Sequence, residues 1–465
     1  MNEQLEYAEP FLVLEEHTQD GQGNADPEFL KGEALNHYLA KKANEFAKIG
    51  LLRWYDREWY MFNGVIYHSL NEDVFFSYAF QNASAENVTL NAGQCKLLLR
   101  ETKIRALEIL NAPNDENYTV FANGLFSNFD GSQLLTIPSD YFATISVNGN
   151  YLQNAPLSHP ITDAFLNTVT GGDPELIARH WEFWGYVLSS DAHAKAIFLL
   201  FGASGNNGKS TELALLKNLL SPDSVVSMPL STMLSRFGVH PIRNCRLEFS
   251  GDEGALNLNS EQIGLLKSMS GHDSMTADVK HKGMVQFVCT CKIAISSNYN
   301  IGMAYSAVDP AFSRRLVTIP YPVSIPKEQQ DPNILYKLLK EKDAIVTEAF
   351  NYFLHLKARN YKFTGSERFD AAPPMHFAPV NTEYDAVRAF SENFCDFSNQ
   401  EAFTSTDELY QMFMSYYGAL FKDSTGFSQA FGLVNSGKIQ NKRQHTSQHN
   451  VRGFTGVKLI TPNRI

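Results

Sequence analysis

The sequence is poor in cysteine and has no pattern that would gather its thiols around a metal ion. Its cysteines include no C-x-x-C pair, the spacing typical of small zinc sites. We therefore expect buried free thiols in a reducing compartment. The five cysteines are Cys95, Cys245, Cys289, Cys291 and Cys395.

The sequence also lacks a signal peptide and an apolar run of membrane-spanning length, so we expect a cytoplasmic protein with no membrane partner. It has no excess of positive charge, because 39 Lys and Arg face 50 Asp and Glu, which gives a formal net charge of −11. This balance argues against a protein coated in basic patches. Any surface that binds nucleic acid must be local, for example inside a channel.

The centre of the chain, in contrast, holds a phosphate-binding sequence. The apolar run Ile197–Phe201 has the length of one buried strand, a loop rich in Gly and Asn follows, and Glu212–Leu220 has a helical pattern. In this context GASGNNGKST is typical of a loop whose backbone N–H groups wrap an anion. The candidate nucleotide-binding residues are Gly202, Ala203, Ser204, Gly205, Asn206, Asn207, Gly208, Lys209, Ser210 and Thr211.

Two side chains of this loop have specific expected roles. Lys209 can reach the β- and γ-phosphates of ATP, and the Ser210 hydroxyl can bind Mg²⁺. The consensus G-x-x-x-x-G-K-[ST] has glycine where Ala203 stands, and Gly202 lies one residue earlier. We therefore expect a loop one residue longer, in which Gly205 supplies part of the turn. The alternative is a surface loop that happens to contain GKS.

Downstream, the segment RLEFSGDE has the pattern of a strand that ends in two adjacent carboxylates. Phosphoryl transfer needs one carboxylate to hold the water shell of Mg²⁺ and one to orient the attacking water. We assign Asp252 to the first role, as a metal-binding residue, and Glu253 to the second, as a catalytic residue. Asp-Glu pairs are also common on protein surfaces, so this assignment depends on the phosphate loop that precedes it.

A basic segment follows and is expected at the tip of a β-hairpin. Its residues Lys280, His281 and Lys282 precede Gly283. Such a tip is usually only solvated. In a ring-shaped motor it would project into the pore and grip the phosphates of DNA.

Two further polar positions flank apolar strands. Asn298 ends the expected strand 292–297 and could hold the attacking water or sense the γ-phosphate, or it could simply terminate the strand. Arg314 and Arg315 precede another apolar strand. One of them is a candidate arginine finger, which stabilises charge on the transferring phosphoryl group from a neighbouring subunit. A structural ion pair is the alternative role for the other.

The order of these motifs resembles the AAA+ core of superfamily 3 helicases, as found in the primase-helicases of phages, plasmids and poxvirus-like viruses. The segments that carry the resemblance are GASGNNGKST, RLEFSGDE, LLKSMSGHDSMTADVKHK, KIAISSN and FSRRLVTIPY, and the likeness extends over residues 115–360. It implies an ATPase that uses ATP and Mg²⁺ and assembles as a homo-hexameric ring. It also implies basic hairpins that move single-stranded DNA through the pore in the 3′→5′ direction.

The resemblance gives an α/β fold class: an AAA+ P-loop NTPase core with an α+β N-terminal region and a C-terminal winged-helix-like domain. In the last domain Lys442, Arg443 and Arg452 could contact DNA from a basic β-wing, or lie on a solvated basic loop. The expected domains are an acidic and polar tail (1–30), a collar region for oligomerisation (31–160), the ATPase domain (161–360), a linker (361–380) and the winged-helix-like domain (381–465).

Residues 1–150 lack the strand-borne D-x-D or D-x-E motif that a primase domain uses to bind two metal ions. We therefore expect the helicase part without primase activity, working with a separate primase or polymerase. The leading hypothesis is an ATP-dependent DNA helicase in the replication of a phage or mobile genetic element. One alternative is an ATP-regulated protein that binds and melts duplex origin DNA without processive unwinding. Another is a P-loop kinase for small molecules, indifferent to DNA.

Overall fold

The computed structural model describes most of the chain, including most of the loop after Phe201 and much of the regions on either side of the central domain. None of the described helices combines the length and apolar character needed to cross a lipid bilayer. The predicted tail lies almost wholly outside the described residues, as do Ala203, Ser204 and Lys280–Lys282. The described ranges are 30–109, 113–134, 141–202, 205–253, 257–279, 283–298, 302–303, 310–370, 383–417, 420–445 and 450–460.

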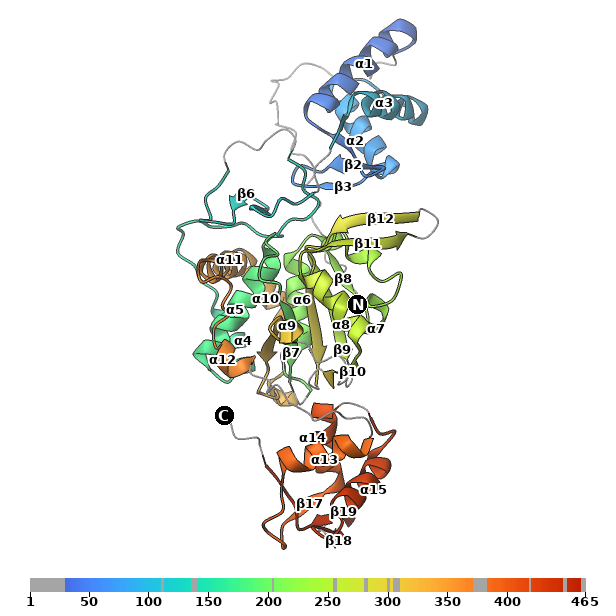
Figure 1. Ribbon diagram of the computed structural model, residues 1–465. Coiled ribbons are helices and arrows are strands. Elements are labelled where there is room, and N and C mark those ends of the chain that lie inside the picture. The colour runs from blue at the N-terminus through green and yellow to red at the C-terminus, as the bar shows by residue number, and fades with distance from the viewer. Residues whose placement is uncertain are drawn as a thin grey trace.

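The N-terminal region combines three helices with a four-stranded sheet of order β3-β2-β1-β4 (Figure 1). Asn71 and Asn91 cap α2 and α3, because their side chains accept hydrogen bonds from backbone N–H groups of the first turn. Apolar side chains of all three helices form a hydrophobic core of their own. The elements are α1 (Gly32–Lys48), β1 (Leu52–Tyr55), β2 (Glu58–Phe62), β3 (Tyr67–Ser69), α2 (Glu72–Ala85), α3 (Ala92–Arg105) and β4 (Leu107–Glu108).

A β-hairpin and two helices lead into the central domain. Asp173 caps α5 by accepting hydrogen bonds from the N–H groups of Glu175 and Leu176. Helix α5 packs closely on α11, and a Cβ atom at Gly185 would lie 1.9 Å from the carbonyl oxygen of Ala349. Only glycine therefore allows this approach of the two helices. The elements are β5 (Tyr118–Phe121), β6 (Gly124–Ser127), α4 (Pro160–Thr170), α5 (Pro174–Leu188) and α11 (Lys342–Ala358).

The central domain is built on a five-stranded parallel sheet of order β15-β7-β13-β9-β8. The predicted strand before the phosphate loop is confirmed as β7, and the strand predicted at 292–297 is confirmed as β13. Because all five strands are parallel, their carboxyl ends meet at one edge of the sheet, where ligands bind in open α/β folds. The strands are β7 (Ile197–Phe201), β8 (Val225–Ser227), β9 (Leu247–Glu253), β13 (Lys292–Ser297) and β15 (Leu316–Pro320).

Both faces of this sheet are covered, as is typical of parallel sheets. Along β7, Phe198 and Leu200 point into the core shared with α5, α6 and α11, whereas Ile197 and Leu199 point into the core shared with α7 and α8. The α/β class predicted from the sequence is thus confirmed at the level of a parallel sheet between two layers. Further elements of the domain are α6 (Lys209–Leu219), α7 (Leu230–Met233), β10 (Asn257–Leu258), α8 (Ser260–Ser270), β14 (Gly302–Met303), α9 (Pro310–Ser313) and α10 (Ile334–Leu339).

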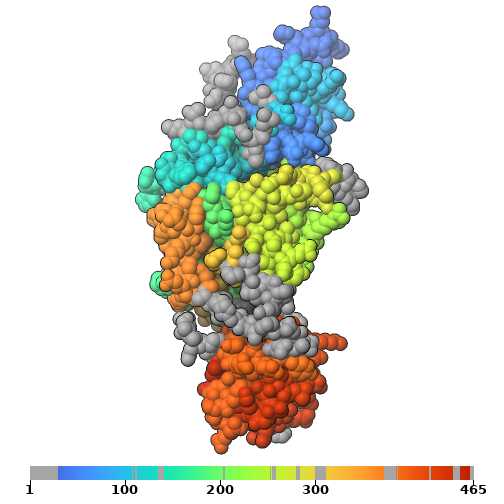
Figure 2. Space-filling model, in the orientation of Figure 1, coloured from blue at the N-terminus to red at the C-terminus, as the bar shows by residue number. Residues whose placement is uncertain are grey.

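The strands on either side of the basic segment form a hairpin, as the sequence predicts. Strands β11 (Ser274–Val279) and β12 (Gly283–Val288) pair antiparallel, and their last pair is Val279 with Gly283. The hairpin forms part of the molecular surface (yellow in Figure 2). Its tip, residues 280–282, lies outside the described part of the chain, so the placement of Lys280, His281 and Lys282 is not described.

The first half of the linker expected at 361–380 is a folded part of the chain. Residues 361–370 contain α12 (Ser366–Phe369) and pack on the central domain. The buried guanidinium of Arg179 donates to the carbonyl oxygens of Thr318 and Thr364, both at 2.8 Å, and forms an ion pair with Asp370. Phe363 joins the core beneath the sheet. These contacts come from residues far away in the sequence, which is why the local composition suggests a linker.

The C-terminal region has a separate, strongly aromatic core around Phe390. It combines three helices with a three-stranded sheet of order β17-β19-β18, whose first strand precedes the second and third helices. Helix α14 begins with a capping box, in which Ser405 and Glu408 exchange side-chain and backbone hydrogen bonds. The elements are α13 (Glu383–Phe394), β16 (Cys395–Asp396), β17 (Phe403–Ser405), α14 (Thr406–Tyr417), α15 (Ser424–Val434), β18 (Gln440–His445), β19 (Asn450–Thr455) and β20 (Lys458–Leu459). All five cysteines of the chain are free and buried, as expected.

Candidate nucleotide site

The loop after β7 is shaped by glycines and by a tight backbone path. A Cβ atom at Gly202 would lie 2.1 Å from the side-chain nitrogen of Asn207. Gly208 has a φ angle of +95°, and a Cβ atom there would lie 2.6 Å from Val169. Asn206 also has a positive φ angle, 56°. Such left-handed backbone favours glycine and asparagine, so the loop composition follows from its geometry.

Gly208 also occupies the N-cap position of α6, so the loop ends at the N-terminus of an eleven-residue helix. The first N–H groups of a helix have no partner within it and, together with the helix dipole, attract an anion. Ser210 lies exposed in this first turn, and Thr211 is half-buried beside it. Both positions are therefore compatible with the predicted contacts to a phosphate and its metal ion.

Lys209 connects the loop to the neighbouring strand. Its side chain is buried, with a relative exposure of 4%. The Nζ atom donates hydrogen bonds to the carbonyl oxygen of Gly202 at 3.2 Å and to Oδ1 of Asn298 at 2.8 Å. The structure thus brings together two residues that the sequence analysis selected independently. Asn298 itself is exposed at the carboxyl end of β13.

The acidic pair lies on the next strand, β9. Because β13 pairs with both β7 and β9, the carboxyl ends that carry the phosphate loop, Asn298 and Glu253 are adjacent. The Glu253 carboxylate accepts a hydrogen bond from the N–H group of Leu230 at 2.7 Å, and its carbonyl oxygen accepts one from Ser297 at 2.8 Å. Asp252 belongs to the same strand, but its side chain lies outside the described part of the structure.

The two arginines have different surroundings. The Arg315 guanidinium donates to the carbonyl oxygen of Lys267 and, at 3.2 Å, to the hydroxyl of Ser270. Both acceptors lie in the last turn of α8, where a cation interacts favourably with the helix dipole. Arg314 is exposed. Arg315 therefore has a structural role within its own chain, although as a helix cap rather than as an ion pair with a carboxylate.

A buried polar cluster behind the loop was not predicted from the sequence. The Glu212 carboxylate on α6 is fully buried. It accepts hydrogen bonds from the indole of Trp184 at 2.6 Å and the hydroxyl of Tyr321 at 2.5 Å, and the imidazole of His180 lies 2.9 Å away. Burial and the nearby carboxylate raise the pKa of Tyr321 well above its usual value. The cluster fixes α6 against α5 and the segment after β15.

A second buried carboxylate, Glu248, lies on β9 near the candidate site. One of its oxygens is 3.3 Å from the hydroxyl of Ser250, and the other is buried without a hydrogen-bond partner. Burial raises the pKa of Glu248 to about 8, whereas the contact with Ser250 lowers it. Glu248 is therefore mostly protonated at neutral pH. The roles predicted for Asp252 and Glu253 at the sheet edge do not involve this acid.

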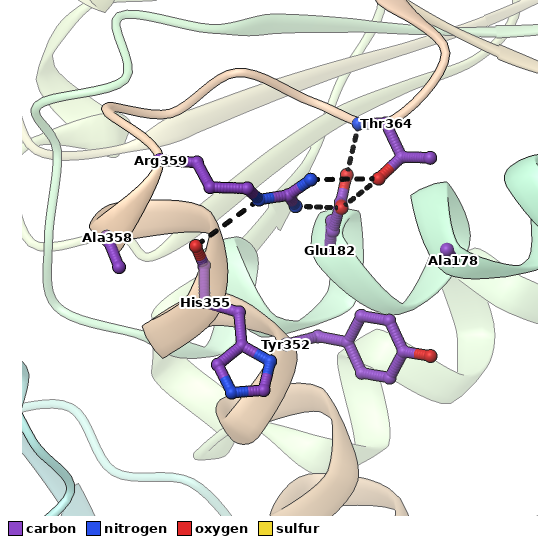
Figure 3. A pocket seen from close by; sticks show the side chains of 7 residues that line it. All are labelled: Ala178, Glu182, Tyr352, His355, Ala358, Arg359 and Thr364. Carbon is purple, nitrogen blue, oxygen red and sulfur yellow. Dashed lines mark hydrogen bonds and ion pairs between the residues drawn. The ribbon is translucent and has the colours of Figure 1, made fainter.

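A shallow pocket elsewhere on the domain does not carry a site of this kind. It lies between α5 and α11, and its acid, Glu182, already accepts hydrogen bonds from Arg359 and from the N–H and hydroxyl groups of Thr364 (Figure 3). None of the lining residues belongs to the phosphate loop. They are Ala178, Glu182, Tyr352, His355, Ala358, Arg359 and Thr364.

One comparison with known proteins matches the part of the chain that holds the candidate site. Residues 200–315 match a family described as a family of unknown function, DUF5906. This stretch begins in β7 and ends at Arg315, so it contains the phosphate loop, the end of β9, the hairpin and the end of β13. No curated protein matches the chain.

Two solved structures are similar over nearly the whole length. One is the A-form apo structure of the NrS-1 C-terminal region, with 10% sequence identity and a TM-score of 0.44 over 93% of this chain and 100% of that one. The other is the apo structure of the NrS-1 C-terminal region (305–718), with 11% identity and a TM-score of 0.45 over 91% and 100% of the two chains. At these values neither structure assigns an activity to this chain.

Proposed function

We propose that this chain is an ATP-driven DNA helicase that translocates on single-stranded DNA during the replication of a phage or mobile genetic element. The observation that carries the proposal is the hydrogen bond of 2.8 Å between Lys209 and Asn298. It joins the phosphate loop to the polar end of the next strand. A γ-phosphate bound in the loop would compete for Lys209, so the contact between this pair would depend on whether ATP is bound.

In this proposal Lys209 exchanges its bond with Asn298 for contacts to the β- and γ-phosphates of ATP. Asn298 is then free to orient a water molecule. Glu253 lies on the next strand and would activate that water after leaving the N–H group of Leu230. Ser210 and Asp252 would hold Mg²⁺, which supplies charge stabilisation at the phosphates.

The assembly and the DNA path follow from the resemblance to superfamily 3 helicases. We propose an AAA+ core, a hexameric ring in which the N-terminal region forms a collar, and 3′→5′ movement. The basic residues 280–282 would contact single-stranded DNA in the pore. Asp278, two residues before this tip, forms an ion pair with Arg236, which holds the hairpin to the domain. Priming would come from a separate primase or polymerase.

The test is ATP turnover by the purified protein with and without single-stranded DNA. We expect single-stranded DNA to stimulate turnover, because the translocating hairpins couple DNA contact to hydrolysis. A tailed duplex then measures unwinding and its direction. Equal turnover with and without DNA would contradict the motor and favour a small-molecule kinase.

Arg314 provides a sharper test of the ring. Arg314→Ala should lower ATP turnover by about 10³-fold, the lower limit for loss of an arginine finger, without loss of stability. Arg315→Ala should instead cost about 1–2 kcal/mol of unfolding free energy, because it removes charged hydrogen bonds to the end of α8. Hydrolysis assays and urea unfolding of both variants measure these effects.

Mixing two inactive variants tests whether the finger acts between subunits. A mixture of Arg314→Ala and Lys209→Ala should regain part of the activity, because some interfaces then combine an intact loop with an intact finger. Arg314→Ala with full activity, or a mixture as inactive as its components, would argue against this role.

A second function, ATP-regulated binding and melting of duplex origin DNA, is favoured by one feature of the C-terminal region. Arg443 on β18 and Arg452 on β19 are direct cross-strand partners, and both are exposed beside Lys442. Like charges directly opposite each other destabilise a sheet. A polyanion such as duplex DNA would offset this repulsion, as expected of the wing of a winged-helix domain.

The double variant Arg443→Ala, Arg452→Ala should weaken duplex DNA binding and reduce the salt dependence of log K by about 2, because two phosphate contacts are lost. Its stability should be equal to or higher than that of the wild type. Binding titrations at several salt concentrations measure this, with Lys422→Ala, an exposed lysine of the same region, as the control. An unchanged salt dependence would exclude the two arginines from the DNA contact.

A further inference from the structure

Two histidines and a glutamate lie together outside the nucleotide site. Glu116 belongs to the turn before β5, His193 to the loop between α5 and β7, and His272 to the turn between α8 and β11. One ligand atom from each residue lies within 4.8 Å of those of the other two. Three segments that are distant in the sequence therefore meet in one group of metal-ligating side chains.

The distances suit a tetrahedral metal ion. Oε1 of Glu116 is 2.7 Å from Nε2 of His272, and Oε2 of Glu116 is 3.5 Å from Nδ1 of His193. Zinc binds nitrogen and oxygen ligands at about 2.0–2.2 Å, which places two ligands of a tetrahedral ion about 3.3 Å apart. The two distances lie on either side of this value, so small side-chain movements would admit the ion.

The glutamate also has an unsatisfied oxygen. Oε2 of Glu116 is buried and has no hydrogen-bond partner, although it lies within ion-pair distance of His193. A buried carboxylate oxygen without a partner is costly. A cation between the carboxylate and the two imidazoles would satisfy it.

The loop that carries His193 is held in place by a buried acid. The carboxylate of Asp191 accepts a hydrogen bond from the N–H group of His193 at 2.9 Å, from Lys357 at 2.8 Å and from Tyr361 at 2.8 Å. These hydrogen bonds fix the backbone that carries the imidazole of His193. The imidazole of His193 is 58% exposed, which gives an ion access from solvent.

We propose that Glu116, His193 and His272 bind a zinc ion. Two imidazoles and one carboxylate are a typical zinc donor set, and water would occupy the fourth position. The site differs from the Mg²⁺ position proposed at the phosphate loop, because Mg²⁺ prefers oxygen ligands. Zinc here would tie the base of the β11–β12 hairpin to the loop that leads into β7 and to the turn before β5.

The test is a zinc titration of the full chain, after removal of metal with a chelator, in competition with a chromophoric zinc indicator. We expect one equivalent to bind. His193→Gln and His272→Asn should each lower the affinity more than about 100-fold, beyond the 10- to 100-fold effect of residues that only support a ligand. Asparagine tolerates the positive φ angle of His272, which is 63°. His37→Gln, at an exposed position of α1, is the matched control.

Thermal unfolding supplies an independent readout. Zinc should raise the melting temperature of the wild type and of His37→Gln but not of His193→Gln, while all three melt alike without metal. Cobalt should give the visible absorption of a tetrahedral complex in the wild type but not in His193→Gln or His272→Asn. Equal zinc affinity in all variants, or no stoichiometric binding to the wild type, would overturn the proposal. None of these readouts depends on ATP turnover.

Discussion

Lys209→Ala is expected to lower ATP turnover by about 10²–10³-fold, the usual effect of removing one preorganised group that stabilises charge in the transition state. Lys209 is the residue that connects the phosphate loop with β13, since its Nζ atom is 3.2 Å from the carbonyl oxygen of Gly202 and 2.8 Å from Asn298. Alanine removes both the positive charge and this connection. Steady-state hydrolysis with and without single-stranded DNA measures the loss.

Lys217→Ala is the matched control, because Lys217 is an exposed lysine in the last turn of the same helix, α6. It should retain wild-type turnover and the same response to DNA. If Lys209→Ala hydrolyses ATP as fast as Lys217→Ala, the loop after β7 is not the nucleotide site, and the proposed motor loses its basis.

The largest expected effect on stability is that of Glu212→Ala, about 3–5 kcal/mol of unfolding free energy. The substitution leaves the buried donors of Trp184 and Tyr321 without their acceptor and removes the partner of His180. Each buried polar group left unsatisfied costs about 1–3 kcal/mol. Alanine also leaves a cavity where the larger side chain stood.

Urea unfolding followed by tryptophan fluorescence measures this loss, since Trp184 is itself part of the cluster. Glu261→Ala is a suitable control, because Glu261 is exposed in the first turn of α8. It should cost no more than about 0.5 kcal/mol, the usual range for surface substitutions. A loss below about 1 kcal/mol for Glu212→Ala would mean that the cluster contributes little to holding α6.

The sequence was sufficient to predict β7 and β13 and the polar residues that follow them. Apolar runs of strand length at 197–201 and 292–297 end in the phosphate loop and in Asn298, and parallel strands bring such ends to one edge. The roles of these residues in ATP hydrolysis remain predictions. Nothing in the sequence distinguished Arg314 from Arg315, because the acceptors of Arg315 lie on α8, more than forty residues away.

The polar clusters could not be predicted from the sequence either, because their members are far apart along the chain. Glu212 lies 109 residues from Tyr321 and 28 from Trp184. The side chains of Glu116 and His272 meet only because the turn before β5 lies beside the turn after α8. The hydrophobic periodicity of a segment indicates which of its faces is buried, but it does not indicate which distant element covers that face.

The contacts of residues 361–370 determine where the central domain can be cut. A fragment that ends at residue 360 would lose Phe363 from the core and would leave the buried Arg179 without Asp370. An unpaired buried guanidinium is strongly destabilising. An isolated fragment of the central domain therefore has to extend through Asp370, because one that ends earlier would lack a stable fold.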